Sequence, residues 1–168
     1  MTIRETFFKV SSVLPEVPKH NPQPSLTARL IWTLLAVVLY LLMAQIPLYG
    51  VVTSSSSLLF FYQIIFAANI GTLMTLGIGP IVTAGLIAQV LIGSDLIHLD
   101  LTNPEDQKFF ASITKILTFI FIIAESVFYV ISGVVGTTLS PYATVIVIFQ
   151  LIIATSIVFL LDQMLQKG

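Results

Sequence analysis

The stretch Leu76-Gly77-Ile78-Gly79-Pro80-Ile81-Val82-Thr83-Ala84-Gly85 decides the fold, because it begins a helix inside an apolar region. Proline at a first helical position loses no hydrogen bond, since its missing N–H would have no partner there. The apolar run 78–92 that follows is only about 22 Å long as a helix, whereas a bilayer core is about 30 Å thick. A helix that begins part-way across a membrane needs protein or a water-filled cavity around its free backbone groups. We therefore predict a conduit or binding site near residues 78–83.

The composition is that of an integral membrane protein. Hydrophobic residues make up 57% of the chain and charged residues 9%, and the mean hydropathy is +1.03. Soluble domains have about a quarter of their residues charged. The first thirty residues lack the apolar region of a signal peptide. The absence of cysteine excludes disulfides and cysteine-based metal or redox chemistry.

Apolar segments divide the chain into residues 1–29, an amino-terminal segment, and residues 30–168, a transmembrane region. Four long segments are expected to span, at about 30–48, 78–92, 116–135 and 142–161. Pro141 precedes the last of these, and Asp162 is expected to end it. The short segment 58–68 cannot span. A re-entrant helix is the favoured interpretation, and a surface helix at the membrane interface is the alternative.

The basic residues predict the orientation. With four spans, three regions share one side of the membrane and contain all seven basic residues: Arg4, Lys9, Lys19, Arg29, Lys108, Lys115 and Lys167. The positive-inside rule therefore predicts that the amino end is cytoplasmic. Residues 3–10 are predicted to form a short amphipathic helix on that surface, with Phe7, Phe8 and Val10 toward lipid. In the last span, Val147 is expected to face lipid.

No enzyme site is indicated by the sequence. His20 and His98 do not stand at metal-ligand spacing from another His, Cys or carboxylate. Gly77 and Gly79 do not form a phosphate-binding loop, because no strand precedes them and no Gly-Lys-Ser/Thr follows. We expect no enzymatic activity, metal, cofactor or nucleic-acid site.

Two motifs resemble the second transmembrane region of the SecY family of protein-conducting channels. They are Asn69-Ile70-Gly71-Thr72-Leu73 and Leu76 to Ile87. Gln107-Lys108 to Lys115 and the carboxyl end, Leu160 to Gly168, also match, with details that look archaeal or eukaryotic-like. The resemblance implies an all-α, polytopic membrane helical bundle with four spanning helices and a plug-like helix. It would be the first part of a ten-span channel, incomplete at its carboxyl end.

The resemblance also implies roles for residues around the helix start. Ile78 and Val82 match the ring of aliphatic side chains at the waist of the channel, and packing against neighbouring helices is the alternative. The plug corresponds to residues 58–68, with Leu58, Phe61, Ile64, Ile65 and Ala68 as its apolar positions. Asn69 departs from the family pattern, in which arginine or another polar residue is common there.

Hinges and a lateral gate complete the site that the resemblance implies. Hinge positions are Gly71, Gly77, Gly79 and Pro80. Thr83 and Glu125 match polar positions at the lateral gate, through which membrane helices leave for the lipid. An acid inside a span usually faces protein or water. A helix-packing hydrogen bond, through Ser126 or a missing helix, is the alternative role for Glu125.

The implied function is that of the central pore subunit of a Sec-type translocation channel, which passes secretory polypeptides and releases membrane helices laterally. The expected partners are single-span SecE/gamma-type and beta-type subunits, a ribosome or cytosolic motor, signal sequences, nascent polypeptides and membrane lipid. The membrane would be the plasma membrane of an archaeon or the endoplasmic reticulum of a eukaryote. A secondary transporter, which also contains broken helices at mid-membrane, is the main alternative. An assembly subunit without a pore is a third possibility.

Overall fold

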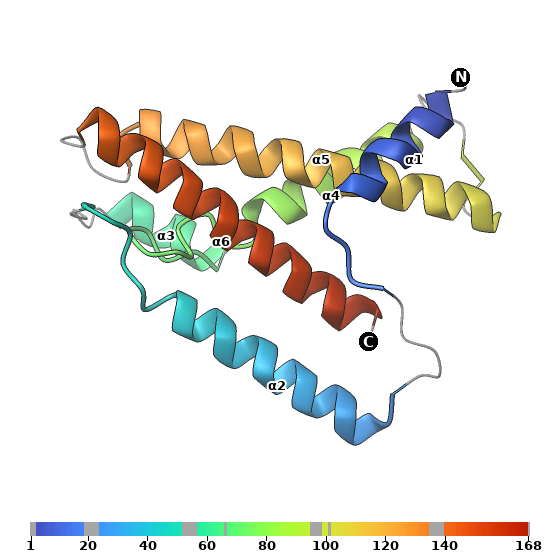
Figure 1. Cartoon of the computed structure of the whole chain (residues 1–168), viewed down its shortest axis with the longest axis horizontal. Coiled ribbons are helices and arrows are strands. Elements are labelled where there is room, and N and C mark those ends of the chain that lie inside the picture. The colour runs from blue at the N-terminus through green and yellow to red at the C-terminus, as the bar shows by residue number, and fades with distance from the viewer. Residues whose placement is uncertain are drawn as a thin grey trace.

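A computed structural model describes residues 3–18, 24–51, 57–65, 67–94, 99–100, 102–134 and 140–167. Its elements in these ranges are helices: α1 (Ile3–Val13), α2 (Leu26–Met43), α3 (Ser57–Ile65), α4 (Gly79–Gly93), α5 (Pro104–Ile131) and α6 (Pro141–Lys167). Pro47 and Thr72 form an isolated antiparallel bridge. The long helices run along the molecule, as Figure 1 shows. The all-α prediction is therefore confirmed.

Three helices, α2, α5 and α6, are long and apolar enough to cross a membrane. The fourth apolar helix, α4, has only 15 residues. It begins at Gly79 with Pro80 in its first turn, and Ile78 is its N-cap residue. The helix therefore starts where the glycine and proline pattern places it, and it is too short to cross the full hydrocarbon core.

The first long helix ends earlier than expected. It stops at Met43 instead of continuing to residue 48. Pro47 disfavours helical backbone at the residue before it. Residues 46–48 instead pair with the segment before α4: Leu73 N donates to the Ile46 carbonyl (3.0 Å), and Leu48 N donates to the Gly71 carbonyl (2.9 Å). The end of α2 is thus held against the start of α4.

The two longest helices extend beyond their apolar segments. The Asn103 side chain caps α5 by accepting a hydrogen bond from Glu105 N (3.1 Å), so the helix starts at Pro104 and contains Lys108 and Lys115. The helix α6 continues beyond the apolar segment that Asp162 ends, as far as Lys167. The Gln166 amide donates to the Asp162 carboxylate (2.7 Å) one turn along the helix, a spacing at which side chains are neighbours.

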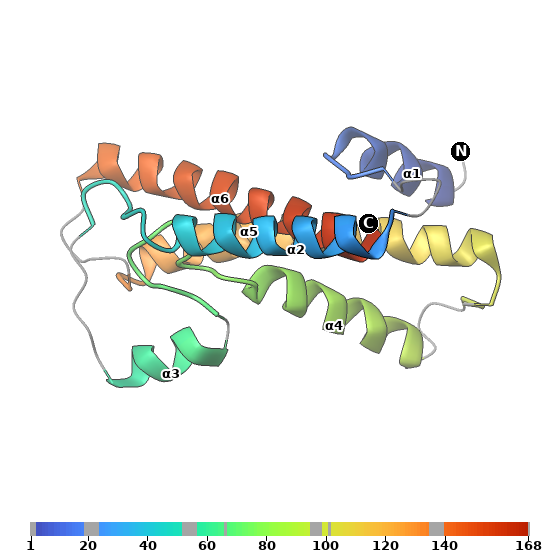
Figure 2. The same ribbon diagram turned by 90° about the horizontal axis from the view of Figure 1, so that it is seen from below.

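The helix α5 lies at the centre of the packing. Helices α1, α4 and α6 pack against it, and α2 packs against α6. Figure 2 shows α4 and α6 on different sides of α5. One core cluster consists of Leu48, Leu76, Tyr129, Val130, Val147 and Leu151. Since Val147 is fully buried (0% exposed), the expectation that it faces lipid is wrong, whereas Phe149 on the same helix is 62% exposed.

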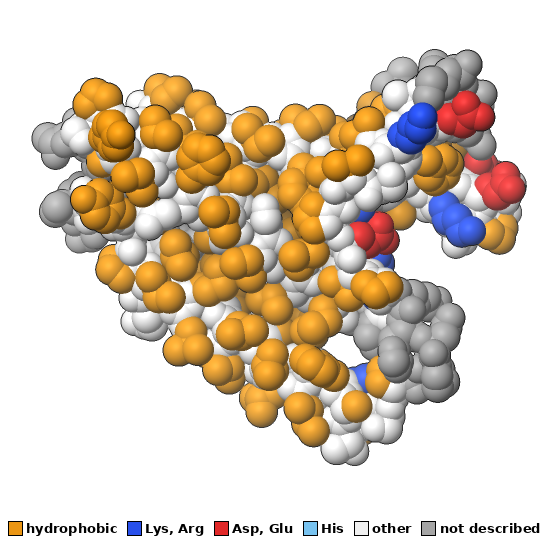
Figure 3. Space-filling view, viewed as in Figure 1, with side chains coloured by type: hydrophobic (Ala, Val, Ile, Leu, Met, Phe, Trp, Pro, Cys, Tyr) orange, Lys and Arg blue, Asp and Glu red, His pale blue; other side chains and the backbone are white. Residues whose placement is uncertain are grey.

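Charged side chains gather at one end of the molecule. In Figure 3 the visible Lys, Arg, Asp and Glu side chains lie toward the end of the molecule that contains α1 and the starts of α5 and α2, and the remaining surface is largely apolar. This end also contains the start of α2 and the end of α6 (Figure 1). It is called the charged end below, and the opposite end is called the uncharged end.

The amino-terminal helix packs differently from the prediction. The ring of Phe7 meets the ring of Phe109 on α5 edge-on, with centroids 5.8 Å apart. The Phe8 and Phe109 centroids are 6.0 Å apart. Both rings therefore contact α5 rather than facing only lipid. The helix is present as predicted, but it is docked on the bundle.

Candidate functional site

The segment before α4 is a compact, buried turn. Gly71 (φ +90°) and Gly77 (φ +56°) have left-handed backbone conformations, which glycine adopts without steric cost. Gly71 N donates to Thr75 Oγ1 (3.0 Å), and that hydroxyl donates to the Thr72 carbonyl (2.6 Å). Met74 and Leu76 are buried beside it. The turn thus fixes where α4 starts, and a hinge role for its glycines stays a prediction.

Ile78 and Val82 lie together on one face at the start of α4. The Val82 N–H donates to the Ile78 carbonyl (3.1 Å), which places the two residues one turn apart. Their neighbours Gly79, Pro80 and Ala84 are buried, yet Ile78 is 36% exposed and Val82 is 41% exposed. Two aliphatic side chains are therefore presented outward at the point where the shortened helix begins.

Thr83 and Glu125 are not brought into contact. The Thr83 hydroxyl donates to the Gly79 carbonyl of its own helix (2.9 Å). Glu125 is half-buried on α5. Its neighbour Ser126 is fully buried, and the Ser126 hydroxyl donates to the Ile122 carbonyl (2.6 Å). Ser126 is thus hydrogen-bonded within its own helix, and the gate and packing roles of Glu125 both stay predictions.

The short helix α3 covers most of the expected plug segment. Its apolar side chains Phe61, Ile64 and Ile65 are exposed. Ala68 is half-buried beyond the helix, and the side chain of Leu58 lies outside the described residues. In Figure 2 the ribbon of α3 stands clear of α4 and α6. The exposed apolar face of α3 is a surface that a membrane protein places against protein or lipid.

Two side chains connect the end of α3 to α2. The Tyr40 hydroxyl donates to the carbonyl of Ala67, whose backbone is left-handed (φ 48°). The Asn69 amide donates to the Ala44 carbonyl (2.8 Å), at the carboxyl end of α2. Sequence reasoning noted Asn69 only as a departure from a pattern and missed this contact. The signal in the sequence was an uncharged side-chain donor, Asn69, that follows a helix, because carbonyl groups at helix ends need donors.

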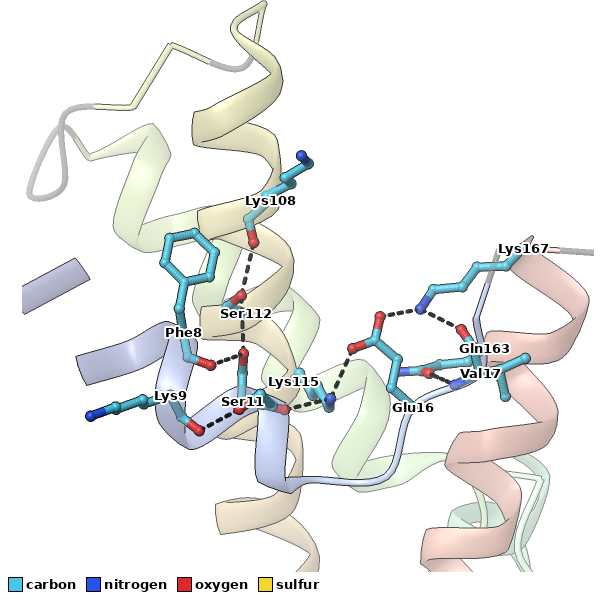
Figure 4. A network of polar contacts seen from close by, with 11 residues as sticks. Phe8, Lys9, Ser11, Glu16, Val17, Lys108, Ser112, Lys115, Gln163 and Lys167 are labelled. Carbon is cyan, nitrogen blue, oxygen red and sulfur yellow. Dashed lines mark hydrogen bonds and ion pairs between the residues drawn. The ribbon is translucent and has the colours of Figure 1, made fainter. Parts of the chain in front are cut away.

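A polar cluster at the charged end was not predicted from the sequence (Figure 4). The Glu16 carboxylate pairs with Lys115 of α5 (2.9 Å) and with Lys167 of α6 (2.5 Å). Lys115 is 5% exposed. Hydrogen bonds from Lys167 and then Lys115 hold the pKa of Glu16 below its usual range. This cluster joins three parts of the chain that lie far apart in sequence.

No metal site is present among the described residues: no three His, Cys, Asp or Glu side chains there are grouped closely enough to hold an ion. The features that remain are an outward-facing aliphatic pair, a buried glycine turn and an exposed apolar helix. None of these carries out bond-making chemistry. The aliphatic pair and α3 expose apolar side chains, and the turn between them is buried.

Family models match this chain over most of its length. The model for SecY matches residues 72–168, and the model for the plug domain of Sec61p matches residues 38–71. The chain belongs to the SecY family. The plug-domain match spans α3 and both side-chain connections to α2. The SecY match begins within the glycine turn and continues through α6.

Individual relatives agree with this assignment. The protein translocase subunit SecY of Sulfolobus acidocaldarius is 49% identical over 164 residues, which cover 95% of this chain and 35% of that protein. A solved structure of a protein-conducting channel is similar with a TM-score of 0.85 and 34% identity, over 95% of this chain and 37% of the other. Sec61 in the canine ribosome-channel complex gives the same values. The SecY family chain thus spans about a third of the length of these relatives.

Proposed function

We propose that this chain supplies the first-half elements of a Sec-type channel that conducts secretory polypeptides and releases membrane helices into lipid. The observation that carries the proposal is the exposed pair Ile78 and Val82 at the start of the shortened helix α4. A full-length spanning helix has its ends at the two interfaces. A helix that starts part-way across has its first turn inside the membrane, where protein or a water-filled cavity must surround its free backbone groups.

The chemistry of the pair suits a polypeptide pore. Aliphatic side chains form a constriction that dewets, so it resists ion leakage when no polypeptide is present. They offer no fixed hydrogen bonds, so a translocating chain of any sequence meets the same surface. Ile78 and Val82 would supply part of this ring, and other helices of the assembled channel would complete it. Polar coordination at the helix break, which a transporter would need for its substrate, is replaced here by aliphatic side chains.

The remaining predicted residues take roles around the ring. The exposed apolar positions Phe61, Ile64 and Ile65 of α3 would close the ring from the non-cytoplasmic side, together with Leu58 and Ala68. Gly71, Gly77, Gly79 and Pro80 would serve as the hinge between plug and ring. Thr83 on α4 and Glu125 on α5 would present polar groups at the lateral gate. The packing of α4 against α5 supports a shared gate wall.

Orientation and partners follow from the charge distribution and the relatives. The gathering of basic residues at one end supports a cytoplasmic position for the charged end, including the amino terminus. The likeness to Sec61 in a ribosome-channel complex supports a ribosome as a partner at that end. Single-span SecE/gamma-type and beta-type subunits would cover the apolar outer surface. The membrane would be the archaeal plasma membrane or the endoplasmic reticulum.

A crosslinking experiment tests the pore assignment. A single cysteine replaces Val82 in the assembled channel, and a secretory polypeptide with one cysteine is stalled in transit. We expect a disulfide between the two. The matched control is Phe149→Cys, on the exposed face of α6, where no disulfide is expected. The chain itself contains no cysteine, so the background is clean. Equal crosslinking at both positions, or none at Val82 with insertion verified, would overturn the assignment.

A further inference from the structure

We propose that Glu16 is a positioning residue that sets the spacing between α5 and α6 at the charged end. It acts through residues 3–18, which are called the strap below. The strap comprises α1 and the extended segment that follows it, and it crosses from α5 to α6 (Figure 4). The effect of Glu16 on gating, given below, rests on the proposed channel function, whereas its effect on the spacing between α5 and α6 does not.

The first half of the strap is docked on α5. The rings of Phe7 and Phe8 pack against Phe109. Farther along α1, the Ser11 hydroxyl lies 3.3 Å from the Ser112 hydroxyl, and both serines are buried. The Lys115 ammonium donates to the Ser11 carbonyl (2.6 Å). These contacts attach α1 to one face of a single helix.

The second half of the strap reaches α6. Val17 N donates to the side-chain oxygen of the buried Gln163 (3.0 Å). The Lys167 ammonium donates to the Val17 carbonyl (2.9 Å). Both polar backbone groups of Val17 are therefore bonded to the last turns of α6. The backbone of the strap is thus hydrogen-bonded to α5 at Ser11 and to α6 at Val17.

Glu16 stands between these attachments and joins them. One carboxylate oxygen accepts from Lys115 of α5 and the other accepts from Lys167 of α6. A carboxylate has two acceptor oxygens and can serve two cations at once, whereas an amide has one oxygen and would turn its NH₂ toward a cation. Lys115 is almost fully buried, and a buried charge that loses its partner is strongly unfavourable. The pairing therefore requires a carboxylate at this position.

Direct helix packing is one part of what sets the spacing at this end: the rings of Phe119 on α5 and Phe159 on α6 meet edge-on, with centroids 5.4 Å apart. A cavity of about 590 Å³ lies beside the strap, with Ile81 and Gly85 of α4, Thr114 of α5 and Phe159 of α6 among its lining residues. The charged groups around it are Glu16, Lys108, Lys115, Asp162 and Lys167. Beyond the contact of Phe119 with Phe159, the strap adds a second connection between α5 and α6, through the two ion pairs of Glu16.

The consequence concerns the proposed gate. The helix α5 carries Glu125 and packs against α4, whose first turn carries Val82. A strap that limits the separation of α5 from α6 also limits how far this gate wall swings. Loss of Glu16 would therefore loosen the charged end of α5 and make lateral opening easier.

Spin labels measure the spacing directly. One label replaces Glu105 on α5 and the other replaces Leu165 on α6, both exposed positions. We expect Glu16→Gln to lengthen and broaden the distance distribution between the labels. The matched control is Glu5→Gln, which removes an acidic charge from α1 away from Lys115 and Lys167. Distances that are unchanged in Glu16→Gln, or changed equally in Glu5→Gln, would overturn the proposal.

A second variant separates positioning from simple loss of folding. Lys167→Met removes the contacts of Lys167 with the Glu16 carboxylate and the Val17 carbonyl, and it leaves the docking of α1 on α5 intact. It should broaden the distances as Glu16→Gln does, and the double variant should broaden them by less than the sum of the two single ones, because both remove the pair between Glu16 and Lys167. Additive broadening would contradict this shared mechanism.

The link to gating is measured separately, as the fraction of a marginally hydrophobic helix that the assembled channel releases into lipid. We expect Glu16→Gln to raise that fraction at least about twofold. Unchanged release despite altered spacing would overturn the link between strap and gate. The Val82 crosslink reports on the pore itself, so a failure of the strap is distinguishable from a failure of the channel assignment.

Discussion

The two ends of this molecule are held by different kinds of contact. At the charged end, side chains of the strap reach α5 and α6 through aromatic packing, ion pairs and a buried lysine. At the uncharged end, α3 presents exposed Phe and Ile side chains. Among the described residues, the segment that follows α3 is joined to α2 by hydrogen bonds from the side chains of Tyr40 and Asn69. One end is anchored by many coupled side chains and the other by a few separate ones.

The comparison shows which parts of this fold can move at a low cost in free energy. Separate hydrogen bonds of about 1 kcal/mol each are broken and remade easily. A coupled cluster with a buried charge is broken only at a much larger cost. From this difference we expect the segment matched to the plug domain to be displaced at a lower cost in free energy than the strap. Four substitutions or conditions probe this difference, from the largest expected effect to the smallest.

Removing the aromatic anchor should have the largest effect. Phe109→Ala deletes the ring that both Phe7 and Phe8 contact. We expect a loss of about 3 kcal/mol, the typical cost of deleting a buried phenyl ring. The measurement is hydrogen exchange of residues 3–13, which should lose protection. Phe128→Ala, at an exposed position of the same helix, is the control. Retained protection in Phe109→Ala would mean that the strap is held by its polar contacts alone.

The glycine turn should be the next most sensitive feature. Gly71→Ala forces a side chain into a backbone conformation with φ +90°, at a cost of about 2 kcal/mol. Gly85→Ala is the control, because an added Cβ there meets nothing within 4 Å. That change should stabilise α4 by up to about 1 kcal/mol, the helix-propensity difference between the two residues. The free energy of unfolding in detergent micelles distinguishes the two. Equal effects would refute the role of the turn.

The connection at Asn69 should have a smaller effect. Asn69→Ala removes the hydrogen bond to the Ala44 carbonyl and should cost about 1 kcal/mol. The loss should appear as faster hydrogen exchange in residues 67–75, with α1 unaffected. Gln89→Ala, at an exposed position on α4, should stay within about 0.5 kcal/mol of the parent. Faster exchange at α1 would show that the two ends are coupled rather than separate.

The pH dependence of the strap should be the smallest effect. The ion pairs lower the pKa of Glu16, so its stabilisation is fully present above the ordinary pKa of about 4.3 and is lost as pH falls through the lower folded value. The carboxylate is half exposed, which limits the effect to about 1 kcal/mol or less. Unfolding measured from about pH 5 to pH 3 should show this loss in the parent. Glu16→Gln should lack it, and an identical pH profile would exclude Glu16 as its source.

The start of α4 could be predicted because its signals are local. Two glycines and Pro80 lie within five residues of one another, and the apolar-rich run that follows contains no charged residue. The charge asymmetry was likewise visible, since it is a count along the chain. The early end of α2 was missed because hydropathy continues through Leu48, although Pro47 disfavours helix there. Local backbone chemistry decided that boundary, and apolar character did not.

The strap could not be predicted for a different reason. Glu16 lies 99 residues from Lys115 and 151 residues from Lys167 in the sequence. The sequence offered only three charged residues in polar flanks. Their meeting depends on α5 and α6 extending beyond their apolar segments as helix. Similarly, the burial of Val147 follows from which face of α6 meets the turn before α4, and the nearly all-apolar sequence of α6 does not mark that face.

The sparse packing of α2 bears on how this protein is made. Only Ala36 and Met43 are buried in its 18 residues, so the helix gains little from the rest of the bundle. A membrane helix of this kind is stable in lipid before its neighbours arrive. We therefore expect α2 to enter the bilayer alone during synthesis and to remain there as a complete helix until the other helices are inserted. The shorter α4, which cannot cross by itself, would then be assembled against it and α5 as later segments emerge.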